Sequence, residues 1–245
     1  MYKMVIGIDM GHPFNCGAFG IMSETDGNRA VGKLLIEKLE SLRHTVVNCT
    51  YDINVNELAN RVALANAQSL NYFISLHMDS FDNASANGVT IYTTENSSAK
   101  NKANEIVNVV ANSCGYNNRG WKSANFYVLK NTNAPAMLLE MGFVTNQDDC
   151  NRFNAEDIAN AIIKGLTGES STEDENGYIV TNYLPHSSGD YDGVDINYVL
   201  SYFQNVKCYV RGNEKGIWIE TQYLSMDKCN ELKSTLGSWF YEIKY

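Results

Sequence analysis

Two histidines and two glutamates lie where they could hold a metal ion and move a proton. His12 and His77 each end an apolar run, "IGIDMGH" and "YFISLH". Glu140 interrupts the apolar segment "PAMLLEMGF", and Glu24 follows His12 by twelve residues. Imidazole nitrogens and carboxylate oxygens are ligands of zinc, and catalytic zinc sites use three protein ligands with a fourth position left to water. Two histidines, one ligating glutamate and one further glutamate as base would complete a metallohydrolase.

Spacing alone leaves a structural alternative open. A single histidine at the end of a strand has a structural role more often than a functional one. A carboxylate inside an apolar strand is less easily explained, because an unpaired buried charge costs several kcal/mol. Glu140 is therefore harder to explain as a purely structural residue than either histidine.

The segments that must position these residues alternate between strand and helix patterns over residues 1–167. Apolar runs predict strands at 4–9, 44–49, 72–77, 88–94, 125–130 and 135–143. Apolar residues at helical spacing predict amphipathic helices at 25–42, 54–69, 99–114 and 155–166. This alternation predicts an α/β fold, a sheet flanked by helices. In such folds ligands bind at the carboxyl ends of the strands, where both histidines are expected.

An acidic segment divides the chain into two predicted domains, 1–167 and 178–245. The segment "GESSTEDENG" (168–177) has four acidic residues and no basic or large apolar one, which predicts a solvated linker. Residues 178–245 follow a strand–helix–strand–strand–helix–strand pattern with a hairpin turn at "GNEKG". This β-α-β-β-α-β order predicts a small α+β domain of the ferredoxin-like type. His44 and His186 are predicted to be surface residues.

Composition and charge exclude some classes of partner. The net charge of −9 argues against nucleic acid, whose phosphates require a basic surface. No stretch approaches the ~20 apolar residues of a membrane helix, so no membrane insertion is expected. The sequence shows no secretory signal pattern, and its six cysteines are scattered, so we expect a protein made in the cytoplasm with free thiols.

Several blocks of residues 4–167 carry a family resemblance. They are "IGIDMGH", "GIMSETDGNRAVGKLLIEKLE", "NELANRVALANAQSLNYFISLHMDS", "NGVTIYT" and "NNRGWKSANFYVLKNTNAPAMLLEMGFVTN", of which the final "LLEMGFVTN" is the most telling. Together they resemble the zinc-dependent N-acetylmuramoyl-L-alanine amidases of the amidase-3 type. The resemblance implies a mostly parallel, twisted sheet with helices on both faces. It also implies one Zn²⁺ ion held by His12, Glu24 and His77, with Glu140 as the catalytic acid/base.

Two positions depart from the family pattern. The family usually has Gly-His-Gly where this chain has Gly11-His12-Pro13, and a proline biases the residue before it toward an extended backbone. The family often has an asparagine two residues after the third ligand, where this chain has Asp79. We expect the first change to alter the loop and the second to affect substrate contacts or the electrostatics beside the metal. Neither removes a ligand.

The resemblance implies a peptidoglycan hydrolase. Zinc would hold a water, lower its pKa toward ~7 and polarise the scissile carbonyl. Glu140 would take the proton of the water and give it to the departing amine. The bond cleaved would be the amide between the lactyl group of N-acetylmuramic acid and the L-alanine of the stem peptide.

The second domain resembles SPOR-type cell-wall-binding modules in its pattern of elements, not in any motif. Tyr209, Trp218, Tyr223 and Trp239 could offer rings to sugars of a wall polymer, or could pack the core of a small domain. A wall-degrading front half without a leader favours a bacteriophage endolysin that stays in the host cytoplasm until the membrane is breached and then reaches the wall. The alternatives are a catalytically inactive wall-binding or regulatory protein on an amidase scaffold, and a related zinc carboxypeptidase.

Overall fold

The protein divides into two compact units, Met1–Ser171 and Thr172–Tyr245, and each is described by itself. The structure, a computed structural model, describes residues 3–168, 178–184, 195–224 and 226–244. The predicted acidic linker, apart from Gly168, and His186 lie outside the described residues. In the described part of the chain, no helix combines the length and apolar character needed to cross a membrane.

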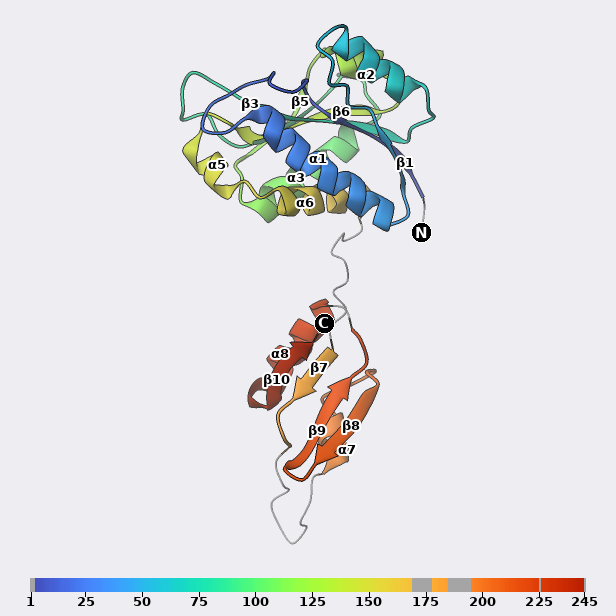
Figure 1. Cartoon of the computed structure of the whole chain (residues 1–245), viewed down its shortest axis with the longest axis vertical. Helices are drawn as coiled ribbons and strands as arrows, with labels where there is room; N and C mark the ends of the chain where they lie inside the picture. Colours follow the sequence, from blue (N-terminus) through green and yellow to red (C-terminus); the bar gives the residue numbers. More distant parts are fainter. Residues whose placement is uncertain (1–2, 169–177, 185–194, 225, 245) are drawn as a thin grey trace. The chain divides into compact units, whose positions relative to one another are not determined.

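A six-stranded sheet forms the middle layer of the first unit (Figure 1). Its strands are β1 (Val5–Met10), β2 (Thr45–Asn48), β3 (Tyr72–Asp79), β4 (Val89–Thr93), β5 (Asn118–Ser123) and β6 (Ala136–Phe143). They lie in the order β2-β1-β3-β6-β4-β5, and β4 runs antiparallel to β6 while the other neighbouring pairs are parallel. The predicted α/β class with a mostly parallel sheet is confirmed.

Helices cover both faces of this sheet, as Figure 1 shows. The helices α1 (Glu24–Ser41), α3 (Lys100–Cys114) and α6 (Ala155–Thr167) pack on one face over the larger apolar core, and α2 (Glu57–Asn66) and α4 (Tyr127–Asn131) cover the other. A short helix, α5 (Gln147–Arg152), follows β6.

The sequence explains where α1 begins and which side it buries. The side chain of Ser23 accepts a hydrogen bond from the backbone N–H of Asp26, which caps the amino end of the helix. Val31, Leu35 and Leu39 recur at intervals of four residues, and all three are fully buried. Each contributes roughly 1.5–3 kcal/mol by leaving water. The first turn of α1, which contains Glu24, is thereby fixed against the sheet.

Two local predictions are wrong. The run 125–130 was expected to be a strand, but 127–131 is the helix α4, and the edge strand is 118–123 instead. Successive residues Val128 and Leu129 both belong to the apolar cluster on the α2 face of the sheet, whereas successive residues of a strand point to opposite faces. His44 is 5% exposed rather than a surface residue. Its Nδ1 accepts a hydrogen bond of 3.2 Å from the backbone N–H of Met4, which ties the end of α1 to the first strand.

The second unit has the predicted order of elements. It contains β7 (Tyr178–Thr181), α7 (Ile196–Leu200), β8 (Cys208–Asn213), β9 (Gly216–Thr221), α8 (Met226–Leu236), a 3₁₀ turn (Gly237–Trp239) and β10 (Phe240–Lys244). The sheet has the order β10-β7-β9-β8 and is antiparallel throughout. Asn213 pairs with Gly216, so β8 and β9 form the predicted hairpin. One face of this sheet packs on a core that includes Ile219 of β9 and Leu232 of α8.

Candidate metal centre and active site

Three predicted ligands meet at the carboxyl ends of β1 and β3. His12 lies two residues after the end of β1, His77 lies within β3, and Glu24 is the first residue of α1. Their ligand atoms all lie within 4.8 Å of one another. Oε1 of Glu24 is 3.1 Å from Nε2 of His12 and 2.9 Å from Nδ1 of His77.

The three side chains of His12, Glu24 and His77 are suitable ligands for a zinc ion. They offer two imidazole nitrogens and one carboxylate oxygen, the combination found in catalytic sites with three protein ligands. Glu24 is 3% exposed, and its Oε2 accepts a hydrogen bond of 2.7 Å from the backbone N–H of Ala18, so Oε1 is held toward both rings. The side chain of His12 keeps 34% of its surface exposed and that of His77 keeps 17%, so the cluster is open on one side.

Electrostatics within the cluster favour a charged carboxylate. Burial alone would raise the pKa of Glu24, but its hydrogen bonds with His12 and His77 outweigh burial and hold that pKa well below its ordinary value. The hydrogen bond from Glu24 raises the pKa of His12, although burial opposes the shift. Without a cation, the carboxylate of Glu24 therefore favours the protonated form of His12. A metal ion would replace that proton, since metal ligands must be deprotonated.

Glu140 lies in β6 beside this cluster. It is the register partner of His77 in the parallel pairing of β3 with β6, so both side chains emerge on the same face of the sheet. Within the described part of the chain, no group hydrogen-bonds to its buried Oε2. Burial raises the pKa of Glu140 well above its ordinary value, and the nearby carboxylates of Asp79 and Glu24 add to the rise. The raised pKa makes Glu140 a stronger base than an ordinary glutamate, as a residue that accepts a proton from water requires.

The main chain at His12 differs from its predicted form. The proline at position 13 was expected to favour an extended backbone, but the φ of His12 is +61°, in the left-handed region. This conformation costs a non-glycine residue about 1–2 kcal/mol, so the contacts of its neighbours must enforce it. The residue before His12, Gly11, lies against the ring of His77, and a Cβ at this position would lie 2.3 Å from Cε1 of His77. Only glycine lets the main chain pass this close to the imidazole.

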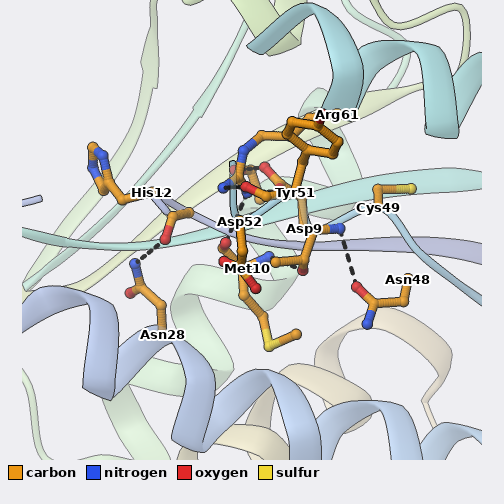
Figure 2. A network of polar contacts seen from close by, with 12 residues as sticks. Asp9, Met10, His12, Asn28, Asn48, Cys49, Tyr51, Asp52 and Arg61 are labelled. Carbon is orange, nitrogen blue, oxygen red and sulfur yellow. Dashed lines mark hydrogen bonds and ion pairs between the residues drawn. The ribbon is translucent and has the colours of Figure 1, made fainter. Parts of the chain in front are cut away.

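A buried ion pair stabilises the end of β1 on the face of the sheet that α2 covers (Figure 2). Arg61 of α2 pairs with Asp9 of β1, and both side chains are 1% exposed. Arg61 also donates to the carbonyl oxygens of Met10 at 2.8 Å and Tyr51 at 2.7 Å, and Ser75 donates to Asp9 at 2.7 Å. We did not single out Asp9 from the sequence, although it is an acidic residue in an apolar strand, the same signal that identified Glu140.

A cavity next to the His12–Glu24–His77 cluster provides room for a substrate. It has a volume of about 420 Å³ and is lined by Ala18, Phe19, Ser80, Phe81, Asp82, Ala84 and Thr145. Ala18 links it to the cluster, because its N–H binds Glu24. Phe19 and Phe81 are 81% and 60% exposed, so their rings are free to contact a ligand there.

The second unit has its own hollow, on the face of the sheet away from its helices. Ile219 points into the core, so Trp218 and Glu220, its neighbours along β9, point to the opposite face. A cavity of about 300 Å³ on this face is lined by Val180, Thr181, Asn182, Tyr183, Trp218, Glu220, Tyr241, Glu242 and Lys244. The ring centroids of Tyr183 and Trp218 are 5.9 Å apart at 90°. Of the four aromatic residues named from the sequence, only Trp218 lines it.

Trp239 does not line this cavity but packs against two tyrosine rings. Its ring lies 5.3 Å from that of Tyr202 and 6.1 Å from that of Tyr198, both in the α7 region.

Comparison with known proteins agrees with this geometry. A family described as N-acetylmuramoyl-L-alanine amidase (Amidase_3) matches residues 6–168. The uncharacterized protein YqiI of Bacillus subtilis (strain 168) is 32% identical over 168 residues, covering 65% of this chain and 81% of that protein. N-acetylmuramoyl-L-alanine amidase LytC of the same strain is 31% identical over 152 residues, which are 60% of this chain and 31% of LytC. This chain therefore aligns with about a third of LytC.

Solved structures show the same fold. The catalytic domain of CwlV, an N-acetylmuramoyl-L-alanine amidase from Bacillus (Paenibacillus) polymyxa var. colistinus, matches with a TM-score of 0.62 and 30% identity. The match covers 68% of this chain and 97% of that domain. An N-acetylmuramoyl-L-alanine amidase from Clostridium difficile 630 matches with a TM-score of 0.62 and 26% identity over 68% of this chain and 96% of the other. The family match ends at residue 168, before the second unit.

Proposed function

The chain belongs to the N-acetylmuramoyl-L-alanine amidase family (Amidase_3), and from this premise we propose that it hydrolyses peptidoglycan with the help of a zinc ion. The bond would be the amide between the lactyl group of N-acetylmuramic acid and the L-alanine of the stem peptide. The observation that carries the proposal is the convergence of His12, Glu24 and His77, with Glu140 opposite His77.

His12, Glu24 and His77 would hold the ion. When bound, zinc supplies Lewis-acid chemistry: it acidifies water and polarises a carbonyl oxygen. The protein fixes the donor atoms before binding, since the carboxylate of Glu24 is already held by Ala18 and faces both imidazoles.

Glu140 would act as the catalytic acid and base. Its carboxylate would accept a proton from the attacking water, and the resulting carboxylic acid would give that proton to the departing amine. The raised pKa supports both steps, because it makes the carboxylate a stronger base than an ordinary glutamate and favours the carboxylic acid that then donates the proton.

Digestion of purified cell walls tests this function against the alternatives. An amidase produces new N-terminal alanine without new reducing sugar ends, a carboxypeptidase releases a terminal amino acid, and an inactive binder releases neither. We expect the amidase products, their loss after treatment with a chelator, and their return with added zinc. Release of a terminal amino acid alone, or activity that a chelator does not affect, would contradict the proposal.

We further propose that the second unit binds a cell-wall polymer. The support is the hollow framed by Trp218, Tyr183 and Tyr241, because aromatic rings beside carboxylate and amide groups can contact both faces and hydroxyls of sugars. Sedimentation of the full chain with purified walls tests this, in a Glu140→Gln background in which digestion should be strongly slowed. Trp218→Ala should reduce the bound fraction, whereas Tyr223→Ala, an exposed tyrosine outside the hollow, should not. Equal binding by both variants would contradict a role for the hollow.

The role in bacteriophage-induced lysis, with passage from host cytoplasm to wall after the membrane is breached, stays a prediction. Producing the protein in a candidate host tests it. Cells should remain intact until the membrane is permeabilised from outside and should then lyse.

A further inference from the structure

Three consecutive carbonyl groups, beginning with the last residue of β1, converge on the guanidinium group of Arg29. Nη1 of Arg29, in α1, donates to the carbonyl oxygens of Met10 at 2.6 Å and Gly11 at 3.1 Å. Nη2 donates to the carbonyl oxygen of His12 at 2.6 Å. Asn28 of the same helix adds a bond of 3.3 Å from Nδ2 to the carbonyl of Gly11, visible in Figure 2.

These bonds hold the main chain at the point where its pairing with the sheet ends. The last backbone bond from this stretch to β3 runs from the N–H of Gly11 to the carbonyl of Leu76, at 2.9 Å. His12 follows with its φ of +61°, and its carbonyl is bound by Arg29. A residue keeps such a conformation only where its surroundings determine it, and such positions cluster at functional sites.

Arg29 is itself firmly placed. It is 5% exposed, it forms an ion pair with Asp52, and its guanidinium carbon lies 5.2 Å from the ring centroid of Phe14. Asp52 lies in the segment between β2 and α2. The planar guanidinium offers several donors in a fixed geometry, which a lysine cannot reproduce.

We propose that Arg29 is a positioning residue for the metal centre, which fixes the main chain of His12 so that its imidazole meets Glu24. The helix α1 would then supply the ligand Glu24 at its first residue. Five residues later it would supply Arg29, which fixes the position of the second ligand, His12. The inference rests on the proposed function for the identity of the ion. A purely structural role, tying α1 to Asp52, is the alternative that the experiment must separate.

The experiment measures zinc affinity of the full-length protein by competition with a chromogenic chelator. Folding of each metal-free variant is measured separately by circular dichroism and thermal unfolding. Arg29→Met removes the donor to the His12 carbonyl, while Met10 keeps its bond from Arg61 and Gly11 keeps its bond from Asn28. We expect the zinc dissociation constant to rise roughly 10- to 100-fold, the range typical of groups that orient a ligand. Arg29→Lys should recover part of the loss, because an ammonium group can reach one or two of the carbonyls.

Two controls separate positioning from stability. Asp52→Asn removes the charged partner of Arg29 but leaves the three carbonyl bonds, so zinc affinity should stay near that of the wild type. Arg152→Met removes another partly buried ion pair, with Asp149, and should lower thermal stability without changing zinc affinity.

Each outcome decides the proposal. A folded Arg29→Met variant with the wild-type dissociation constant would overturn it, and so would Asp52→Asn weakening zinc as much as Arg29→Met does. If Arg29→Met does not fold, Arg29→Lys decides alone: a native spectrum with weakened zinc binding supports positioning, and unchanged affinity or loss of the fold overturns it. A wild-type protein that binds no zinc would overturn the metal in the proposed function as well, so the two failures are distinguishable.

Discussion

Glu140 lies directly opposite His77 in the parallel pairing of β3 with β6. Because register partners in neighbouring strands point to the same face, this pairing places a carboxyl group beside a candidate metal ligand. Both residues lie within strands, and neither is held by a loop. Both residues belong to strands buried in the middle of the sheet, so their separation is set by the backbone ladder. The proposed base and one proposed ligand are therefore positioned by the pairing of two central strands.

Replacing Glu140 by glutamine should separate catalysis from metal binding. Glutamine keeps the size of the side chain but cannot accept the proton of the water, so turnover should fall by roughly 10²- to 10⁴-fold. Zinc affinity should be retained, because Glu140 is not among the three clustered ligands. Release of N-terminal alanine and chelator competition measure the two properties. Normal turnover would remove Glu140 from the mechanism.

The same substitution should change how the stability of the metal-free protein depends on pH. Burial, with Asp79 and Glu24 nearby, raises the pKa of Glu140 in the folded state above its value in the unfolded chain. The stabilising contribution of its protonated form is then complete below the unfolded value of about 4.3 and is lost as the pH rises through the folded value. Glu140→Gln should therefore gain stability relative to the wild type as the pH increases.

Urea unfolding at a series of pH values, with a chelator present, measures this difference. Glu37→Gln, on the exposed side of α1, is the matched control and should show no such trend. A constant difference between Glu140→Gln and the wild type at all pH values would show that Glu140 is not desolvated.

Adding one methyl group at Gly11 should weaken the metal centre. A Cβ there would lie 2.3 Å from Cε1 of His77, which real contacts do not allow, so the imidazole must move. We expect Gly11→Ala to raise the zinc dissociation constant roughly tenfold or more. Gly212→Ala, where the nearest atom is at an ordinary 3.4 Å, serves as the control. Unchanged affinity would mean that His77 can shift without cost.

Loss of Arg61 should destabilise the whole first unit. Arg61→Met leaves Asp9 buried with Ser75 as its remaining side-chain partner, and breaking a buried ion pair in this way costs about 3–5 kcal/mol. Urea unfolding measures this cost. The double variant with Asp9→Asn should recover part of it, since no unpaired charge remains. As a control, Lys38→Met breaks an ion pair with the exposed Glu156 and should cost no more than about 1 kcal/mol.

Much of the fold could be predicted because its signals are local. The helix α1 is specified by its capping serine and by apolar residues at intervals of four, and the central strands by uninterrupted apolar runs. The segment 127–131 could not be predicted in this way. Its apolar run fits a strand or a helix, and only packing against α2 selects the helix.

The sequence by itself identified the residues of the first unit that we propose to carry chemistry, from two histidines that end apolar runs, a carboxylate inside an apolar strand and the family resemblance. It also determined the α/β class and the order of elements in the second unit, which follow from periodicity. Only the tertiary structure decided how these residues meet. It shows the left-handed main chain of His12, the close approach of Gly11 to the ring of His77, and the binding of three carbonyl groups by Arg29. In the second unit, it shows that Trp239 packs against Tyr202 and does not line the cavity. Each of these depends on contacts between segments distant in the chain, and such contacts form only once the sheet and its helices are in place.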